Sequence, residues 1–273
     1  MKKLISALLV LALVLSLSLP LLAEEKKVVK LGLVGENSEQ WEPVIKRLAE
    51  EGVTLELVKF ADYTLPNRAL QDKEIDLNAF QHYAFLNKEI ETFGYELTVI
   101  GDTIIAPLGL YSKKIKSVDE LKEGDKIAIP SDPTNGGRSL KLLETAGLIK
   151  VDPEAGFLPE KADVTENKLN LDIIEVEAAQ TASLLPDVAA AIINGGHAVD
   201  NGFYPQQDAI YLEQAGGNTD NPFVNVIVAR TADKDDPLYL KIAEYYRTPE
   251  VAEVIAEVYK GAYLPTWEAA PAK

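Results

Sequence analysis

Strand-like and helix-like segments alternate along this chain, and that alternation is the feature that most restricts its fold. It begins with an apolar run at 28–34, a helix-like stretch at 40–50 and a second strand-like run at 53–60. Apolar residues then recur at spacings of three and four, which predicts an amphipathic helix that begins near Phe80 and ends at Gly94. Such alternation favours an α/β fold, in which helices pack on the faces of a sheet.

The second half of the chain continues the alternation. Strand-like runs lie at 126–130, 171–176, 188–193, 209–212 and 223–229, and helix-like stretches lie at 136–146, 237–246 and 249–260. No internal repeat or flexible linker separates these segments, so two lobes, if present, share crossing strands rather than a tether. The segment 151–168 lacks periodicity and is rich in Pro, Glu and Asp, which predicts an irregular excursion.

The N-terminus has the pattern of a secretory leader. Two lysines precede twenty residues without a charge, 4–23, which end in a small alanine shortly after Pro20. Residues 1–23 are therefore predicted to be a signal peptide that is cleaved before Glu24. An uncleaved membrane anchor is the alternative, because twenty apolar residues are just long enough to span a bilayer. The remaining chain of about 250 residues can bury one large core or two smaller ones.

The chain is strongly acidic, with a formal net charge of -16 at pH 7. Nucleic acid is disfavoured as a partner, because a phosphate backbone is bound by clustered Lys and Arg, whereas the longest basic groups here are pairs such as Lys113-Lys114. The chain contains no cysteine. Disulfides, thiolate metal sites, cysteine nucleophiles and a lipid-modified N-terminal cysteine are therefore excluded.

The first candidate site segment is 76–85, a strand end that runs into a helix start. Phe80, His82 and Phe85 are expected to stand around the start of that helix, where they offer two aromatic faces and one imidazole to a ligand. Aromatic faces suit a thioether, whose sulfur gains up to about 1.5 kcal/mol against a ring. The alternative is that the two phenylalanines belong to the core and that His82 only hydrogen-bonds the helix start.

The second candidate is 130–139, a polar segment with two glycines that enters a helix. Free backbone N–H groups at a helix start favour an anion. Arg138 in the first turn can pair bidentately with a carboxylate, which makes an amino acid a more natural ligand than a sugar. Phosphate is disfavoured because the segment lacks the glycine and lysine pattern of phosphate-binding loops. An exposed arginine beside an ordinary helix cap is the alternative.

Two asparagines form the third candidate element. Asn194 follows the strand-like run 188–193, and Asn225 lies inside the run 223–229. Burying an unsatisfied amide costs about 1–3 kcal/mol, so each amide needs a partner. The ammonium and carboxylate of a ligand would satisfy both amides, and neighbouring backbone groups are the alternative partners.

Catalysis is disfavoured. His82 and His197 are the only histidines, and neither lies in a metal-ligand spacing or beside a serine motif such as GxSxG. No pair among the 43 acidic residues stands out as a general acid and base. We therefore expect no catalytic residue, no metal site and no cofactor.

Four blocks of the sequence together resemble the MetQ/NlpA family of methionine-binding proteins. They are DLNAFQH at 76–82, SKKIKSVDEL at 112–121, IPSDPTNGGRSLKLLETAGLI at 129–149 and NPFVNVIV at 221–228. The resemblance implies the type 2 periplasmic-binding-protein fold, an α/β architecture in which two lobes are joined by two crossing strands and enclose a ligand cleft. Lobe I would comprise 24–110 and 226–273, and lobe II would comprise 111–225.

The resemblance also implies a side-chain pocket. Tyr63, Phe80 and His82 fall where the family lines this pocket, and Phe85 replaces a tyrosine that is frequent there, which leaves the pocket more apolar. The segment 195–197 also differs from the family pattern and lies close enough to the cleft to alter ligand choice.

The polar contacts of the ligand are implied in the same way. Arg138 falls where the family binds the ligand carboxylate, and Asn135 lies in the same loop. Asn194 and Asn225 fall at positions that resemble the family's amide contacts. We expect these four residues to hold the charged end of an amino acid.

The resemblance implies a receptor that captures L-methionine and delivers it to a membrane ABC importer complex without catalysis. Another small amino acid or a methionine-containing dipeptide is the alternative ligand. An enzyme on the same fold and a surface adhesion protein are further alternatives. The chain is expected to be exported to the periplasm or the cell exterior, to act as a monomer, and to lack a lipid anchor because it has no cysteine.

Overall fold

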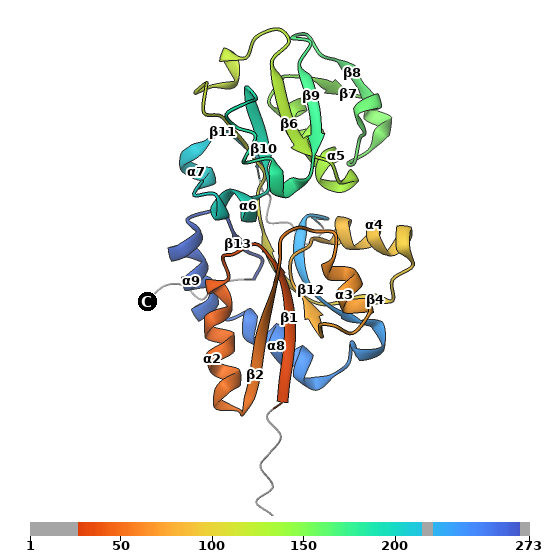
Figure 1. Cartoon of the computed structure of the whole chain (residues 1–273), viewed down its shortest axis with the longest axis vertical. Coiled ribbons are helices and arrows are strands. Elements are labelled where there is room, and N and C mark those ends of the chain that lie inside the picture. The colour runs from red at the N-terminus through yellow and green to blue at the C-terminus, as the bar shows by residue number, and fades with distance from the viewer. Residues whose placement is uncertain (1–26, 215–220, 268–273) are drawn as a thin grey trace, which may run out of the picture.

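The computed structural model describes residues 27–214 and 221–267, which form two lobes stacked along the long axis of the molecule (Figure 1). Each lobe is built around a β-sheet with helices packed against it, which confirms the predicted α/β architecture. Within the described ranges, no helix is long and apolar enough to cross a membrane. The predicted signal peptide, residues 1–23, lies outside the described residues.

The larger lobe contains a six-stranded sheet with the order β13-β4-β12-β3-β1-β2. Its strands are β1 (Lys27–Val34), β2 (Val53–Phe60), β3 (Leu77–Asn78), β4 (Leu97–Ile105), β12 (Val224–Arg230) and β13 (Leu264–Pro265). Strand β1 pairs in parallel with β2 and β3, whereas β12 runs antiparallel to β3 and β4. The helices of this lobe are α2 (Glu42–Glu50), α3 (Pro66–Gln71), α4 (Tyr83–Phe93), α8 (Pro237–Tyr246) and α9 (Pro249–Tyr259).

One core of the larger lobe lies between its sheet and the helices α2, α8 and α9, and a second lies under α3 and α4. Val44 and Leu48 are four residues apart on α2, and both are fully buried, as is Ile242 on α8. The rings of Trp41 and Tyr246 pack beside them with centroids 4.4 Å apart. Burying one such apolar side chain stabilises the fold by about 1.5–3 kcal/mol. The helical spacing of apolar residues in the sequence therefore corresponds to the face that each helix buries.

The smaller lobe contains a five-stranded sheet with the order β11-β5-β10-β6-β9. Its strands are β5 (Gly109–Tyr111), β6 (Lys126–Pro130), β9 (Asp172–Val176), β10 (Ala190–Ile193) and β11 (Ala209–Leu212). Strand β6 is parallel to β9 and β10, and β5 is antiparallel to β10 and β11. The helices of this lobe are α5 (Pro133–Thr145), α6 (Gly195–Asp200) and α7 (Pro205–Asp208).

The segment predicted to be irregular contains short regular pieces. The strands β7 (Lys150–Val151) and β8 (Val164–Glu166) form a two-stranded antiparallel hairpin. Single turns of 3-10 helix occur there and elsewhere, at η1 (Glu39–Trp41), η2 (Val118–Glu120), η3 (Pro153–Ala155), η4 (Lys161–Asp163), η5 (Ala178–Gln180) and η6 (Thr231–Asp233). These pieces are too short to produce a periodic pattern in the sequence.

The chain passes between the lobes twice. It leaves the larger sheet at the end of β4 and enters the smaller sheet at β5, and it returns between β11 and β12. The predicted lobe boundaries, after residues 110 and 225, lie inside β5 and β12 rather than between the strands. The first crossing is hidden in the sequence because residues 104–111 form one apolar run without a polar break.

Two helices begin at residues that place polar side chains at the junction of the lobes. Helix α4 begins three residues later than predicted, because His82 is its N-cap and accepts the backbone N–H of Phe85 at 3.1 Å. Helix α5 begins three residues earlier than predicted, at Pro133, because Asp132 is its N-cap and accepts the N–H of Asn135 at 2.9 Å. Proline is favourable at this first helical position.

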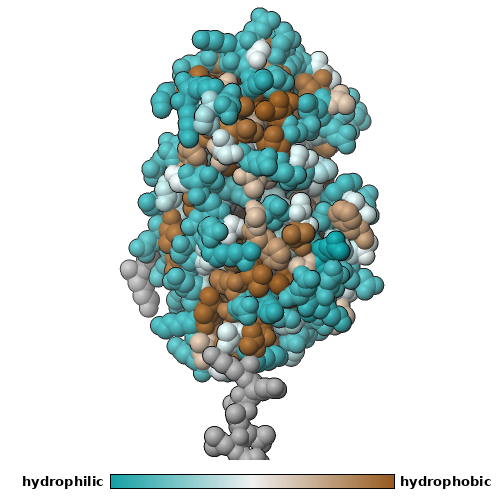
Figure 2. All heavy atoms as spheres, viewed as in Figure 1, coloured by the Kyte–Doolittle hydropathy of each residue, from teal (hydrophilic) through white to brown (hydrophobic). Residues whose placement is uncertain are grey.

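The outer surface carries mainly polar side chains (Figure 2). Figure 2 shows one face of the molecule, which is mostly hydrophilic, with hydrophobic side chains gathered in separate patches on the two lobes.

Candidate functional site

A cavity lies between the two lobes, beside the segments in which the chain crosses. Its volume is about 80 Å³, several times the roughly 10–15 Å³ that one water requires, so it has room for a small solute. All eight residues predicted for a ligand site line this cavity, namely Tyr63, Phe80, His82, Phe85, Asn135, Arg138, Asn194 and Asn225. Their contacts with a ligand stay a prediction. The described part of the chain contains no cluster of three or more side chains that could hold a metal ion.

Three aromatic rings form the apolar end of the cavity. The ring centroids of Tyr63, Phe80 and Phe85 each lie 5.9 Å from the other two, a distance at which aromatic rings attract. Enclosure in the cleft and the nearby Asp132 carboxylate raise the pKa of Tyr63 well above its usual value. The Tyr63 hydroxyl therefore keeps its proton at neutral pH.

The segment that carries Phe80 and His82 is held by the strand beside it. The backbone N–H of Val226 donates to the carbonyl oxygen of Gln81 at 2.9 Å. His82 also forms an isolated antiparallel β-bridge with Asn225. This pairing explains how two segments far apart in the sequence both reach the cavity wall.

His82 has a defined tautomer. Its Nδ1 accepts the N–H of Phe85, so the proton of the neutral ring is on Nε2. Nε2 therefore donates to Oδ1 of Asn135 at 3.3 Å. Burial, reinforced by the charge of Arg138, lowers the pKa of His82 from 6.5 to about 3. His82 consequently connects the two lobes as a neutral hydrogen-bond donor.

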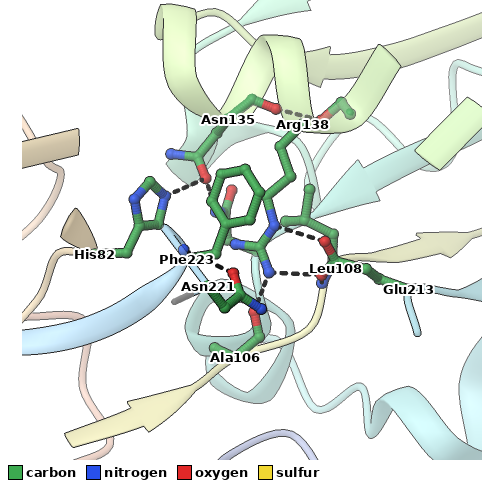
Figure 3. Close-up of polar contacts among 10 residues, drawn as sticks. His82, Ala106, Leu108, Asn135, Arg138, Glu213, Asn221 and Phe223 are labelled. Carbon is green, nitrogen blue, oxygen red and sulfur yellow. Dashed lines mark hydrogen bonds and ion pairs between the residues drawn. The ribbon is translucent and has the colours of Figure 1, made fainter. Parts of the chain in front are cut away.

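Asn135 connects the polar side chains of the site. Its Nδ2 donates to both carboxylate oxygens of Asp132, at 3.0 and 2.9 Å, which fixes the orientation of the amide. Its Oδ1 accepts from His82 (Figure 3), and it also accepts from Nδ2 of Asn194 at 2.9 Å. One amide therefore joins the starts of α4, α5 and α6.

Arg138 lies one turn further along α5 and is only 3% exposed. Its Nε and Nη2 donate to the two carboxylate oxygens of Glu213 at 2.8 and 2.5 Å, and Nη2 also donates to the carbonyl oxygen of Ala106 at 3.0 Å (Figure 3). Glu213 accepts the N–H of Leu108 at 2.9 Å as well. The ring of Phe223 covers one face of the guanidinium at 4.3 Å. Residues from both crossing segments thus meet at Arg138.

A protein carboxylate therefore occupies the edge of the Arg138 guanidinium that the sequence reasoning assigned to a ligand. Nη1 is the guanidinium nitrogen that hydrogen-bonds no described residue, and it carries two N–H donors. Because Arg138 lines the cavity, Nη1 can still receive a ligand carboxylate. Glu213 was missed because it lies 75 residues from Arg138 and belongs to no polar motif.

Two buried polar atoms of the cavity lining have no hydrogen-bond partner among the described residues. They are Oδ1 of Asn194 and Nε2 of His197, in residues that are 8% and 6% exposed. An unpaired buried polar atom costs about 1–3 kcal/mol, so each is a candidate for contact with a ligand. Asn194 was predicted to contact the ligand, whereas His197 was expected only to lie close to the cleft.

Asp200, the last residue of α6, joins the smaller lobe to the loop after β1. Its Oδ1 accepts the backbone N–H groups of Glu36 and Asn37, both at 3.2 Å, and Nδ2 of Asn37 at 2.6 Å. Gly35 makes this approach possible, because a Cβ there would collide with the Asp200 carboxylate and the φ of +91° suits glycine. The contact joins the two lobes directly.

Comparison with known proteins identifies a consistent set of relatives. The model of the family described as NlpA lipoprotein matches residues 29–267. The chain is 41% identical over 243 residues to the D-methionine-binding lipoprotein MetQ of Escherichia coli K12, covering 88% of each chain. It is 41% identical over 247 residues to the probable D-methionine-binding lipoprotein MetQ of Vibrio cholerae, covering 90% of each.

Solved structures agree with this result. A nutrient-binding protein from Burkholderia cenocepacia bound to methionine superposes with a TM-score of 0.82 at 39% identity, covering 88% of this chain and 100% of that one. The methionine-binding protein MetQ superposes with a TM-score of 0.83 at 41% identity, covering 88% and 98%. The predicted type 2 periplasmic-binding-protein fold is thereby confirmed.

Proposed function

The chain belongs to the NlpA lipoprotein family, and we propose that it is an extracytoplasmic solute-binding protein that captures L-methionine and delivers it to an ABC importer. One observation carries the proposal. The cavity combines Oδ1 of Asn194 and the donors on Nη1 of Arg138, none of which has a partner among residues 27–214 and 221–267, with a group of aromatic rings. These features match an ammonium, a carboxylate and a thioether in turn.

The polar end of the cavity suits a ligand without net charge. Among the described residues that line the cavity, Arg138 supplies the cationic side chain, and its ion pair with Glu213 balances that charge. A ligand with a net charge would bury that charge without a partner, which is costly, whereas a zwitterion adds no unbalanced charge. An α-amino acid with an uncharged side chain therefore fits better than a dicarboxylate or a phosphate.

The apolar end suits the methionine side chain. The three rings of Tyr63, Phe80 and Phe85 surround the space into which a flexible thioether would extend. Sulfur gains up to about 1.5 kcal/mol beside an aromatic ring. We propose that the ligand's sulfur lies against these rings while Asn135, together with the other polar residues described above, holds the zwitterion.

A longer ligand is the second candidate, and one feature favours it. A second hollow of about 230 Å³ shares Tyr63 and Phe85 with the wall of the first cavity. A methionine-containing dipeptide, or another amino acid with a longer side chain, would find room there. Mass spectrometry of the ligand that remains bound through purification distinguishes these candidates from free methionine.

Titration calorimetry on ligand-stripped protein tests the proposal. We expect heat of binding with methionine at micromolar concentrations and none with glutamate, whose second carboxylate lacks a partner in the cavity. Both enantiomers are titrated, because the relatives carry D-methionine in their names. The absence of heat with either enantiomer would contradict the proposal.

We further propose that the protein acts outside the cytoplasm as a monomer, without catalysis and without a nucleic-acid partner. The relatives are lipoproteins by name, but this chain has no cysteine to acylate, so we propose that it is not lipid-anchored. The two lobes, with the predicted limits near residues 110 and 225, would close on the ligand. N-terminal sequencing of exported material and light scattering in solution measure the cleavage and the oligomeric state.

A further inference from the structure

His197 brings a polar atom to the apolar end of the cavity. It lies in α6, three residues after Asn194, and its ring centroid is 5.1 Å from that of Tyr63. Both rings line the same cavity. His197 is therefore on the Tyr63 side of the cavity, where the proposed thioether would lie.

The Nε2 atom of His197 lacks a hydrogen-bond partner in the part of the chain that the structure describes. Burial lowers the pKa of His197 below its usual value, although the Asp200 and Asp62 carboxylates act in the opposite direction. The ring is therefore neutral at physiological pH, and each of its nitrogens is either a donor or an acceptor. The free-energy cost of the unpaired atom disappears if a ligand atom becomes its partner.

We propose that His197 determines ligand specificity by donating a hydrogen bond from Nε2 to the sulfur of the methionine side chain. A thioether sulfur is a weak acceptor, whereas the methylene of norleucine, at the same position in a chain of similar shape, accepts nothing. The aromatic rings contact the methionine and norleucine side chains alike. The hydrogen bond from His197 therefore distinguishes the two ligands where the rings do not. This inference rests on the proposed function, because it concerns the side chain of the proposed ligand.

The test compares methionine with norleucine in the full chain after removal of bound ligand. His197→Phe keeps a ring beside Tyr63 and removes Nε2. One net hydrogen bond corresponds to about a three- to tenfold change in affinity, so the preference for methionine is expected to fall by about that factor in calorimetry. Asn225→Ala is the matched control, because it acts on the zwitterion that both ligands share and is expected to weaken both equally.

The outcomes separate this inference from the proposed function. If His197→Phe leaves the methionine preference unchanged, the inference is overturned while methionine binding stands. If the unmodified protein binds neither ligand, both are overturned. His197→Met is measured in the same way if the phenylalanine variant does not fold, because its flexible side chain fills the space without an N–H donor. An unchanged preference in that variant also overturns the inference.

Discussion

The Glu213 carboxylate neutralises a guanidinium that water scarcely reaches, and its removal gives a measurable prediction. Glu213→Gln keeps the shape of the side chain and removes its charge. The carboxylate accepts three hydrogen bonds, two from Arg138 at 2.8 and 2.5 Å and one from the N–H of Leu108 at 2.9 Å. Glutamine has one acceptor oxygen and turns an N–H donor toward another donor, so at least one charged hydrogen bond is lost.

The expected size of the effect follows from these contacts. A hydrogen bond to a charged group contributes about 1.5–3 kcal/mol, and removing one partner of a buried ion pair costs about 3–5 kcal/mol. The Arg138 side chain is 3% exposed and that of Glu213 is 20% exposed, so water recovers part of the loss. We expect Glu213→Gln to lower the free energy of unfolding of the ligand-free protein by about 2–4 kcal/mol.

Urea unfolding followed by far-ultraviolet circular dichroism at neutral pH measures this loss. Glu166→Gln is the matched control, because it makes the same chemical change in a carboxylate that pairs with Lys150 and Lys168 at the surface, where the two lysine side chains are 64% and 77% exposed. An exposed pair contributes at most about 1 kcal/mol. If the Glu213 variant loses no more stability than the Glu166 variant, the reasoning about the buried pair is refuted.

Three further predictions concern the cavity and the contacts across it. Arg138→Ala or Asn225→Ala is expected to weaken methionine binding by at least about tenfold, or about 1.4 kcal/mol, and unchanged affinity in calorimetry would remove that residue from the site. Asp200→Ala removes the acceptor of three hydrogen bonds that come from the opposite lobe. Methionine affinity is therefore expected to fall by about fivefold or more, although Asp200 does not line the cavity. Equal methionine affinities of the variant and the wild type would contradict a role of Asp200 in closure. The pKa of His82 is lowered from 6.5 to about 3, so the unfolded chain binds a proton first as the pH falls, and stability is lost between those two values. Compared with His82→Gln, the wild type should lose about 2 kcal/mol more unfolding free energy between pH 7 and pH 5, and parallel pH curves for the two proteins would argue against the buried neutral ring.

The predicted elements follow from local chemistry where a cap or a proline marks them. Helix α8 begins at Pro237 and ends at Tyr246 as expected, with Asp236 accepting the N–H groups of the first turn. The crossings between the lobes could not be located in the same way. The end of each strand depends on its hydrogen bonds with the neighbouring strands of its sheet, and those strands lie far away in the sequence.

In the candidate site, too, single residues could be predicted from the sequence but their distant partners could not. Asn194 was predicted because a polar amide beside an apolar strand needs a partner, and Asn135 was predicted because it lies in the same loop as Arg138, where the resemblance implies the carboxylate contact. Their mutual hydrogen bond spans 59 residues and was not foreseeable. Glu213 and Asp200 were missed for the same reason. Glu213 binds a residue 75 positions away and Asp200 binds one 163 positions away, and the local spacing of residues cannot predict such distant pairs.

The Arg138–Glu213 pair affects how the binding of methionine depends on the salt concentration of the medium. Although the whole chain carries a formal charge of -16, the cavity presents a balanced pair to an incoming zwitterion, so little long-range force attracts or repels the ligand. Dissolved salt screens long-range forces far more than short contacts in a closed cavity. Methionine affinity is therefore expected to be nearly the same in dilute and in concentrated salt, which calorimetry across a salt series measures. A receptor outside the cytoplasm would then keep its sensitivity while the medium around the cell changes.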